Sequence, residues 1–493
     1  MASYRSALAL AAALAGACLG CHDVRLQAKT AGGEIGLFDD LYSVSVFSDK
    51  QIVAGGYYGA IYRSQDGGQS WRKEATGTER SIYDVSIASN GQGWAVGQSG
   101  LILRTTDGGH TWTPQPNQKA KEGSHLFAVH AIDGNTAWVV GEWGTRMFTD
   151  DGGATWQDFS LTIDEHHPQF VWLAPVDQDR VRNGEKVYED VSLNDVACLP
   201  PPSRSCWIAG EFGYIFTSQN LGQQWDRASI AGDVAPETII VPYNATDITK
   251  DDVARLKAFA QRIQDESHLN VEIEPVANAQ EVATFGKASD PTPLFEILDA
   301  RSTAVRGVIE EAGILSDRIR MRGAPPWDYE DFQKSDPGFL KRYLEARTGA
   351  APGILVRVAQ NPYLFSVRFE NEQNGYVSAL GGLILQSADG GKTWSYKRTA
   401  RRQALFSVAT SKTGRTVAVG EKGFIQVSDD QGHTWTTPSG GFPPIFTFMR
   451  DIAFSPDRST GYIVGQGGMV LRTSDDGATW AQVLPEVTTA AAR

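Results

Sequence analysis

The sequence predicts a mainly β protein, a seven-bladed β-propeller with an inserted α/β domain. Three observations support this prediction. A motif of eight residues recurs seven times, most copies are spaced by 41 to 45 residues, and one long interval changes from strand patterns to helix patterns. Units of four short strands cannot bury both faces alone, and stacking them around an axis solves that problem. A solenoid of the same units is the alternative.

The composition agrees with many short strands. The chain has 493 residues, too many for one ordinary compact domain, and it contains 51 glycines and 13 tryptophans. A formal net charge of −13 argues against nucleic-acid binding, because phosphate binding requires a basic surface. We expect neither a cofactor nor a bound metal.

The repeated motif reads Ser/Thr-x-Asp-x-Gly-x-Thr-Trp. In the copy at 105–112 (TTDGGHTW), Asp107 can accept hydrogen bonds from backbone N–H groups, the two glycines allow positive φ, and Trp112 can cover the turn. We therefore assign the acidic positions to structure and not to catalysis. They are Asp66, Asp107, Asp151, Asn220 (which replaces Asp in a degenerate copy), Asp389, Asp430 and Asp475.

These copies match the Asp-box, or BNR, repeat. Longer units such as GWAVGQSGLILRTTDGGHTW and GYVSALGGLILQSADGGKTW resemble the family of photosystem II stability and assembly factors and its non-photosynthetic bacterial relatives. The resemblance implies a non-enzymatic scaffold that helps another protein or complex to assemble. It does not imply photosynthesis.

The spacing breaks most strongly between Asn220 and Asp389, where 169 residues separate two copies. Strand and helix patterns alternate there, with amphipathic helices expected at 249–267 and 292–312 and strands at 238–242, 270–276, 318–322 and 354–358. We therefore assign 35–236 to blades 1–4, 237–358 to the inserted domain and 359–485 to blades 5–7.

The inserted segment resembles the OmpA-like domain family, which binds peptidoglycan. The similar stretches are IIVPYNATDITKDDVARLKAFAQRI and LFEILDARSTAVRGVIEEAGILSDRIRMRG. Arg301 falls where that family has the arginine that grips a peptide-stem carboxylate, so the resemblance implies a peptidoglycan contact there. A solvated residue on the helix surface is the alternative for Arg301. The aspartate that accompanies it in the family is missing near Asn278.

The N-terminal segment, 1–21, resembles an export signal. Arg5 precedes an apolar run that is too short to span a bilayer as a stable helix. The run ends in ACLGC, which resembles the lipobox of bacterial lipoproteins and makes Cys21 the candidate for lipidation. Cleavage without lipidation and a retained anchor are the alternatives. We expect an exported protein of the bacterial periplasm or outer membrane, attached by its lipid anchor.

Two further cysteines, Cys198 and Cys206, flank seven residues that include three prolines. Two strands joined by such a turn can bring the thiols to disulfide distance, which an oxidising compartment favours. Two unpaired thiols are the alternative. The run from Asp164 to His167 does not predict a metal site, because adjacent residues rarely converge on one ion.

One face of the propeller is predicted to bind a protein partner through short blade loops. The candidate residues are Tyr57, Tyr58, Glu142, Trp143, Glu211 and Phe212, and the four aromatic residues among them are expected at equivalent positions. Packing between blades is the alternative role for the aromatic residues.

The favoured function is therefore a non-enzymatic scaffold or assembly factor of the cell envelope, with a peptidoglycan contact through the inserted domain. The alternative is a glycosidase or sialidase, which requires paired carboxylates, or a Tyr–Glu pair with arginines, near the axis. Glu142, Glu211 and Glu421 recur at equivalent blade positions, so repetition explains them without catalysis.

Overall fold

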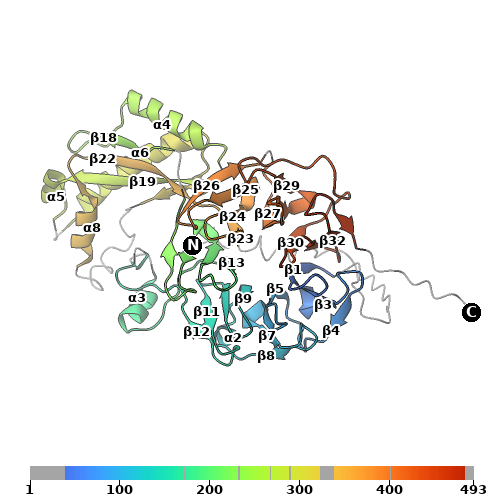
Figure 1. Ribbon diagram of the computed structural model, residues 1–493. Helices are drawn as coiled ribbons and strands as arrows, with labels where there is room; N and C mark the ends of the chain where they lie inside the picture. The colour runs from blue at the N-terminus through green and yellow to red at the C-terminus, as the bar shows by residue number, and fades with distance from the viewer. Residues whose placement is uncertain are drawn as a thin grey trace, which may run out of the picture.

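The computed structural model describes residues 39–167, 169–170, 173–230, 234–266, 268–287, 290–322, 338–399 and 401–483. The predicted signal peptide and Cys21 lie outside these ranges. Figure 1 shows a ring of small sheets beside a separate body of helices and strands. The described part of the chain has no helix that combines the length and the hydropathy needed to cross a bilayer.

Within the described ranges seven small sheets lie in this ring, antiparallel except for one short strand, and for reference we call them blades 1 to 7 in chain order. Their bounds are β1 (Leu41–Val46), β2 (Ile52–Gly56), β3 (Ile61–Ser64) and β4 (Arg72–Glu74) in blade 1; β5 (Ile82–Ile87), β6 (Gly93–Gly97), β7 (Ile102–Thr105) and β8 (Thr113–Pro114) in blade 2; β9 (Leu126–Ala131), β10 (Ala137–Gly141), β11 (Arg146–Thr149) and β12 (Gln157–Asp158) in blade 3; β13 (Leu193–Cys198), β14 (Cys206–Gly210), β15 (Ile215–Ser218) and β16 (Asp226–Arg227) in blade 4; β23 (Leu364–Phe369), β24 (Gly375–Ala379), β25 (Leu383–Ser387) and β26 (Thr393–Arg398) in blade 5; β27 (Leu405–Thr410), β28 (Thr416–Gly420) and β29 (Ile425–Ser428) in blade 6; and β30 (Met449–Phe454), β31 (Gly461–Gly465), β32 (Val470–Thr473) and β33 (Ala481–Gln482) in blade 7. The short strand β17 (Ser229–Ile230) joins blade 5 in parallel to β26.

The first strand of each blade lies nearest the centre of the ring (Figure 1). These strands contact one another in the order β1, β5, β9, β13, β23, β27 and β30, and β30 contacts β1 again. The predicted mainly β architecture, built from antiparallel and mostly four-stranded sheets, is confirmed.

Side chains on the inner strands satisfy the backbone of the neighbouring blade. Asp84 Oδ2 accepts a hydrogen bond from the Val129 N–H at 2.8 Å, and Asp451 Oδ2 accepts one from the Val44 N–H at 2.9 Å. The innermost strand of a sheet has one unpaired edge, and a buried N–H without a partner is costly. The bond from Val44 to Asp451 also joins blade 7 to blade 1, which share no strand.

In blades 3, 4 and 7 a large aromatic residue of the second strand binds the Asp box of the next blade. The indole N–H of Trp138 in blade 3 donates to the Leu221 carbonyl at 3.0 Å, and that of Trp207 in blade 4 donates to the Gly390 carbonyl at 2.8 Å. Tyr462 of blade 7 donates to the Gly67 carbonyl of blade 1 at 2.9 Å. Burial of an indole or phenol in this way requires a partner for its polar atom.

The second body comes from the chain between blades 4 and 5. Its sheet has the order β18-β22-β19-β20, with β21 also pairing β19. The elements are β18 (Glu237–Ile240), α4 (Lys250–Ile263), β19 (Leu269–Asn278), α5 (Ala279–Phe285), α6 (Thr292–Glu311), β20 (Ile319–Met321), α8 (Phe339–Arg347), β21 (Thr348–Gly349) and β22 (Gly353–Gln360). Leu256 and Phe259 of α4 and Val305 of α6 pack on one face of this sheet in a shared apolar core. The sequence patterns did not predict α5.

A second insertion lies between blades 3 and 4 and carries α3 (Pro175–Arg182). It is fixed to the short helix α2 (Gln118–Glu122) by Lys119, whose side chain is fully buried. The Lys119 ammonium lies 3.6 Å from the centre of the Tyr188 ring and 2.9 Å from Glu122 Oε2. The insertion is therefore a packed part of the propeller.

Candidate functional site

Each Asp box holds the turn between the third and fourth strands of its blade. Asp107 Oδ1 accepts from the Thr111 N–H at 2.9 Å, Oδ2 accepts from the Thr111 hydroxyl at 2.6 Å, and the Trp112 indole donates to the Gly109 carbonyl at 2.9 Å. The carboxylate of Asp151 makes the same bonds to Thr155, and these bonds lower its pKa to about 2. The equivalent bonds form at Asp66, Asp389, Asp430 and Asp475 and, through Oδ1 alone, at Asn220.

These acids lie on the opposite end of the strands from the short loops predicted to bind a partner. Each of those loops joins the second strand of a blade to the third. We call the surface formed by the seven turns the turn face; they are Tyr57–Gly59, Gln98–Gly100, Glu142–Gly144, Glu211–Gly213, Leu380–Gly382, Glu421–Gly423 and Gln466–Gly468.

The middle residue of each turn has a left-handed backbone. Tyr58, Trp143 and Phe212 have φ of 56°, 56° and 55°, while Gly381 and Gly467 occupy this position in blades 5 and 7. Tyr58 is 57% exposed and Trp143 is 48% exposed, and the adjacent Tyr57 is 51% exposed. Phe212 is partly exposed. Tyr57 does not occupy the predicted equivalent position. It is the first residue of its turn and aligns with Glu142 and Glu211, one residue before the position of Trp143 and Phe212.

Glu142 and Glu211 hold the backbone of their own blades. Glu142 Oε2 accepts from the His125 N–H at 2.8 Å, and Glu211 Oε2 accepts from the Ser192 N–H at 2.9 Å. Both carboxylates therefore fix the residue just before an inner strand. Of the predicted partner-binding set, Tyr57, Tyr58 and Trp143 are the exposed members, whereas Phe212 and the two glutamates are partly exposed.

Tyr363 lies beside Glu211 and supplies a Tyr–Glu pair, the arrangement that a sialidase-like mechanism requires. Burial raises the pKa of Tyr363, and the charge of Glu211 raises it further. The Tyr363 phenol therefore keeps its proton near neutral pH.

The sequence reasoning missed a set of side chains around the axis at the turn-face end, which we call the collar. They occupy the second position of each inner strand and are all partly exposed: Tyr42, Tyr83, Phe127, Asn194, Phe365, Phe406 and Arg450. Neighbouring rings are close, with centroids 6.2 Å apart for Tyr42 and Tyr83 and 5.2 Å apart for Phe365 and Phe406. The sequence contains a pattern that predicts this set, because each member lies at the same position of the repeat and five of the seven are aromatic.

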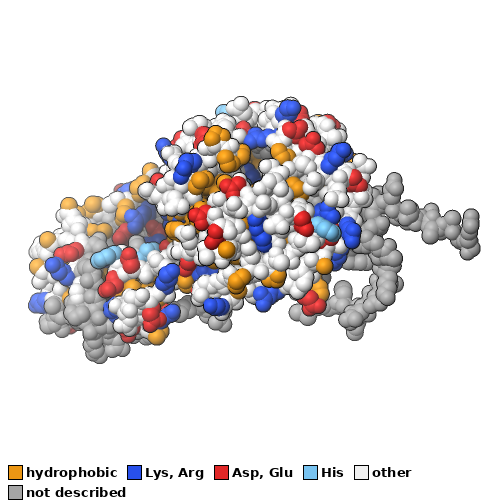
Figure 2. Space-filling view, turned by 60° about the horizontal axis from the view of Figure 1, so that its bottom comes forward, with side chains coloured by type: hydrophobic (Ala, Val, Ile, Leu, Met, Phe, Trp, Pro, Cys, Tyr) orange, Lys and Arg blue, Asp and Glu red, His pale blue; other side chains and the backbone are white. Residues whose placement is uncertain are grey.

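Arg450 is the one cation of the collar. Its guanidinium lies 5.1 Å, 5.2 Å and 5.9 Å from the ring centres of Phe448, Phe406 and Tyr42. Within the described ranges, no ion pair and no side-chain hydrogen bond engages this guanidinium. In the space-filling view, hydrophobic side chains gather around a hollow in the surface (Figure 2). The collar can thus accept an apolar group that carries an anion.

Deeper along the axis lie Asp84, Asp195 and Asp451 with Arg368 and His130. Arg368 donates to Asp195. Burial raises the pKa of Asp84 to about 7, although hydrogen bonds from Ser43 and Val129 oppose the shift. Burial and the charge of Arg368 lower the pKa of His130 to about 4. The described residues contain no group of three or more acidic, His or Cys side chains placed to hold a metal, the Asp164–His167 run included.

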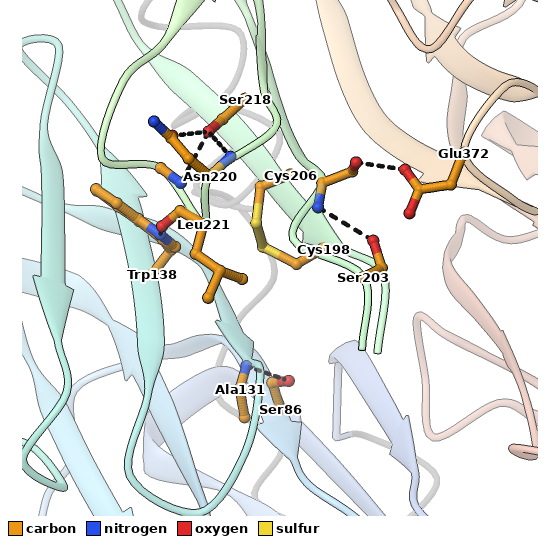
Figure 3. The surroundings of a disulfide bond; sticks show 12 residues. Ser86, Ala131, Trp138, Cys198, Ser203, Cys206, Ser218, Asn220, Leu221 and Glu372 are labelled. Atoms are coloured by element: carbon orange, nitrogen blue, oxygen red, sulfur yellow. Dashed lines mark hydrogen bonds between the residues drawn. A yellow bond between two sulfur atoms is a disulfide. The ribbon is translucent and has the colours of Figure 1, made fainter. Parts of the chain in front are cut away.

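Cys198 and Cys206 form the predicted disulfide (Figure 3). They face each other in the β13–β14 pair, with Cα atoms 4.0 Å apart. The bond closes the loop that carries Ser203 and the three prolines. The alternative of two unpaired thiols is therefore wrong.

The structure contradicts the predicted peptidoglycan contact of Arg301. This side chain is fully buried on α6, where its Nη1 and Nη2 atoms lie 3.0 Å and 2.6 Å from the two carboxylate oxygens of Glu281. Its Nε donates to the Ala245 carbonyl at 2.8 Å. Glu281 is also fully buried and accepts from the Asn244 N–H at 2.8 Å. The guanidinium therefore has no free edge for an external carboxylate. The cause is α5, which supplies Glu281.

The fold and these turns define a β-propeller with Asp-box turns. The family model described as Photosynthesis system II assembly factor YCF48 matches residues 74–169, which contain blades 2 and 3. No curated protein matches the chain in sequence.

Three solved structures are similar to the chain. The structure titled YCF48 bound to D1 peptide has a TM-score of 0.48 and 15% identity, covering 90% of this chain and 96% of that one. YCF48 from Cyanidioschyzon merolae has a TM-score of 0.48 and 13% identity, with coverages of 89% and 97%. The WD40 β-propeller domain of Doa1 has a TM-score of 0.43 and 8% identity, with coverages of 91% and 99%.

Proposed function

We propose that this chain is a non-enzymatic assembly factor or scaffold that binds a protein partner on the turn face of a closed seven-bladed propeller. The match of residues 74–169 to a family of assembly factors supports the class of function. The cycle of contacts among the inner strands supports the closed ring of seven blades.

The observation that carries the proposal is the placement of large aromatic side chains on left-handed backbone. A non-glycine residue in this region is disfavoured by roughly 1 kcal/mol, and bulky residues are rare there. Gly381 and Gly467 demonstrate that glycine fits the same turn. Tyr58 and Trp143 are about half exposed, so internal packing does not account for both rings. Exposed aromatic residues on strained backbone are typical of binding surfaces.

The collar continues this surface toward the axis. Its rings lie beside Arg450, whose guanidinium forms no ion pair with a described residue, although the charge of Asp40 acts on it. An apolar segment of the partner with a nearby carboxylate would complement both features. The net charge of −13 disfavours a nucleic acid as the ligand of this face.

We propose the bacterial cell envelope as the location, with export through residues 1–21 and lipidation at Cys21. The disulfide between Cys198 and Cys206 supports an oxidising compartment. The succession of strands and helices from β18 to β22 supports an OmpA-like fold for the inserted body. Peptidoglycan binding through Arg301 has no part in this proposal.

Site-specific photo-cross-linking tests the function. Tyr58 and Trp143 are replaced, one at a time, by p-benzoylphenylalanine in cells that express the full chain. Leu315 of the inserted body, which is 67% exposed, serves as the matched control. We expect both turn-face positions to capture the same protein and the control not to capture it. Equal capture from all three positions would refute a specific turn-face partner.

An activity assay tests the non-enzymatic part. The purified protein is incubated with a panel of polysaccharides, beside a variant with Glu142→Gln and Glu211→Gln. We expect no released sugar from either protein. Release by the wild type that the double variant lacks would establish the hydrolase instead.

A further inference from the structure

Blade 6 lacks a backbone bond that the other six blades make. In blade 2 the Gln115 N–H of the outer strand donates to the Ile102 carbonyl at 2.9 Å, and in blade 4 the Ala228 N–H donates to the Ile215 carbonyl at 2.9 Å. Blades 3 and 7 make the same bond, and blades 1 and 5 pair the equivalent residues within their sheets. In blade 6 the equivalent residue is Ile425, which pairs with Val419 of β28. Among the described residues, the backbone of the outer segment pairs with β29 at one bridge, between Val427 and Thr436.

The sequence gives the reason for this difference. The residue that aligns with Gln115 is Pro438, which has no N–H to donate. The Ile425 carbonyl instead accepts from the side chain of Gln426 at 2.8 Å. Strand alternation directs the Ile425 N–H to the same outer edge as the Val427 N–H, which donates to the Thr436 carbonyl at 2.9 Å. Among the described residues the fully buried Gln426 Oε1 has no hydrogen-bond partner. The outer edge of β29 is therefore open over its first residues.

A cavity of about 220 Å³ occupies the place that the outer strand has left. It is lined by Gly423, Ile425, Thr437, Pro438, Ser439, Gly440, Phe442, Pro443 and Ile445, none of which is charged. Phe442 stacks on Trp480 of blade 7 with ring centroids 5.8 Å apart, which fixes the outer wall. The cavity is thus a groove with a strand edge on one side and an apolar wall on the other.

The groove opens onto the turn face. Gly423 belongs to the blade 6 turn, and its N–H donates to the Thr447 carbonyl at 3.1 Å. Between Thr447 and the lining residue Ile445 lies Phe446, which at 84% is the most exposed of the large hydrophobic residues described. A partner seated on the turn face can therefore reach the groove past the blade 6 turn, where the Lys422 ammonium lies 3.6 Å from the Glu421 carboxylate.

We propose that an extended, uncharged segment of the protein partner enters this groove and adds a strand to the outer edge of β29. The backbone of the segment accepts a hydrogen bond from the Ile425 N–H, and its alternate side chains fill the cavity beside Phe442 and Ile445. Strand addition to an open sheet edge is an established mode of peptide recognition. Unpaired edges are otherwise covered in native proteins. This inference rests on the proposed turn-face function and names the form in which the partner binds.

Hydrogen exchange tests the open edge in the full chain alone. Electron-transfer fragmentation resolves single amides in the segment 423–428. We expect the Ile425 amide to exchange about 100-fold faster than the bonded Val427 amide. Equal protection of the two amides in the free protein would mean that another segment or a second copy already covers the edge, and it would overturn the proposal.

Photo-cross-linking then tests the occupant. p-Benzoylphenylalanine is placed at Ser439 inside the groove, at Tyr58 on the turn face and at Leu315 as the control. We expect Ser439 and Tyr58 to capture the same protein, with the Ser439 cross-link confined to one short segment. Capture from Tyr58 without capture from Ser439 would overturn strand addition and leave the turn-face function standing. A failure at Tyr58 itself would instead remove the proposed function.

Discussion

Replacing the left-handed aromatic residues by glycine separates binding from stability. In the variants Tyr58→Gly and Trp143→Gly the backbone conformation becomes favourable, which returns roughly 1 kcal/mol. Glycine costs about 0.5–1 kcal/mol more conformational entropy on folding. Each ring is about half buried, and full burial of a large apolar side chain is worth about 1.5–3 kcal/mol, so the lost burial is about 1 kcal/mol.

These contributions nearly cancel. We expect each variant to lose less than about 1 kcal/mol of unfolding free energy, measured by urea denaturation. The matched control is Ser99→Gly at the same turn position, where φ is 53° and almost no apolar surface is removed. Ser99→Gly should leave the stability unchanged or raise it by a few tenths of a kcal/mol.

Binding should respond differently. An aromatic anchor at an interface typically contributes at least about 2 kcal/mol, which is roughly a 30-fold change in Kd. Once the partner has been identified by cross-linking, its affinity for each variant can be measured by calorimetry. If Trp143→Gly lowers the free energy of unfolding by more than about 2 kcal/mol while the affinity for the partner stays the same, the ring serves internal packing and the reasoning is wrong.

Three further predictions concern single acidic residues. Asp107→Ala should lower the free energy of unfolding by about 1–2 kcal/mol, because Thr111 loses two hydrogen bonds. Asp107→Asn should lower it by less, because Asn220 in blade 4 keeps one of these bonds through its Oδ1 atom. Urea titrations of both variants measure the two losses. Burial raises the pKa of Asp84 to about 7 in the folded protein, so the unfolded chain binds fewer protons than the folded one between pH 4 and 7. The free energy of unfolding should therefore fall as the pH rises through that window. Asp84→Asn should flatten this slope in thermal melts recorded over a pH series, and an unchanged slope would exclude Asp84 as its source. Glu281→Ala should cost about 3–5 kcal/mol by leaving Arg301 buried and unpaired, and a second change, Arg301→Met, should recover most of that loss in a double-mutant cycle.

Local sequence patterns were sufficient for most of the fold. The Asp boxes could be interpreted directly, because every group that the turn needs lies within eight residues of the chain. The same holds for the disulfide, since a short hairpin leaves Cys198 and Cys206 few other arrangements. Helix α4 was also expected, because its apolar face and its capping residue Thr249 are both local signals.

Other features required the packed structure. Helix α5 was missed, and with it the carboxylate of Glu281 that occupies Arg301, because a buried ion pair depends on two segments that are distant in sequence. The collar was missed because its members come from seven different strands and meet only at the axis. The open edge in blade 6 follows from Pro438, which has no N–H to donate. It could be recognised only by comparison with the backbone bonds that the other blades form at the same position.

Strand alternation and turn chemistry are encoded within each repeat, so the repeated strand units and their Asp-box turns could be predicted from local sequence. The accessibility of individual side chains could not be predicted in this way. Burial and pairing depend on neighbours from other blades, and those neighbours leave Tyr58, Trp143 and Arg450 accessible while they enclose Arg301.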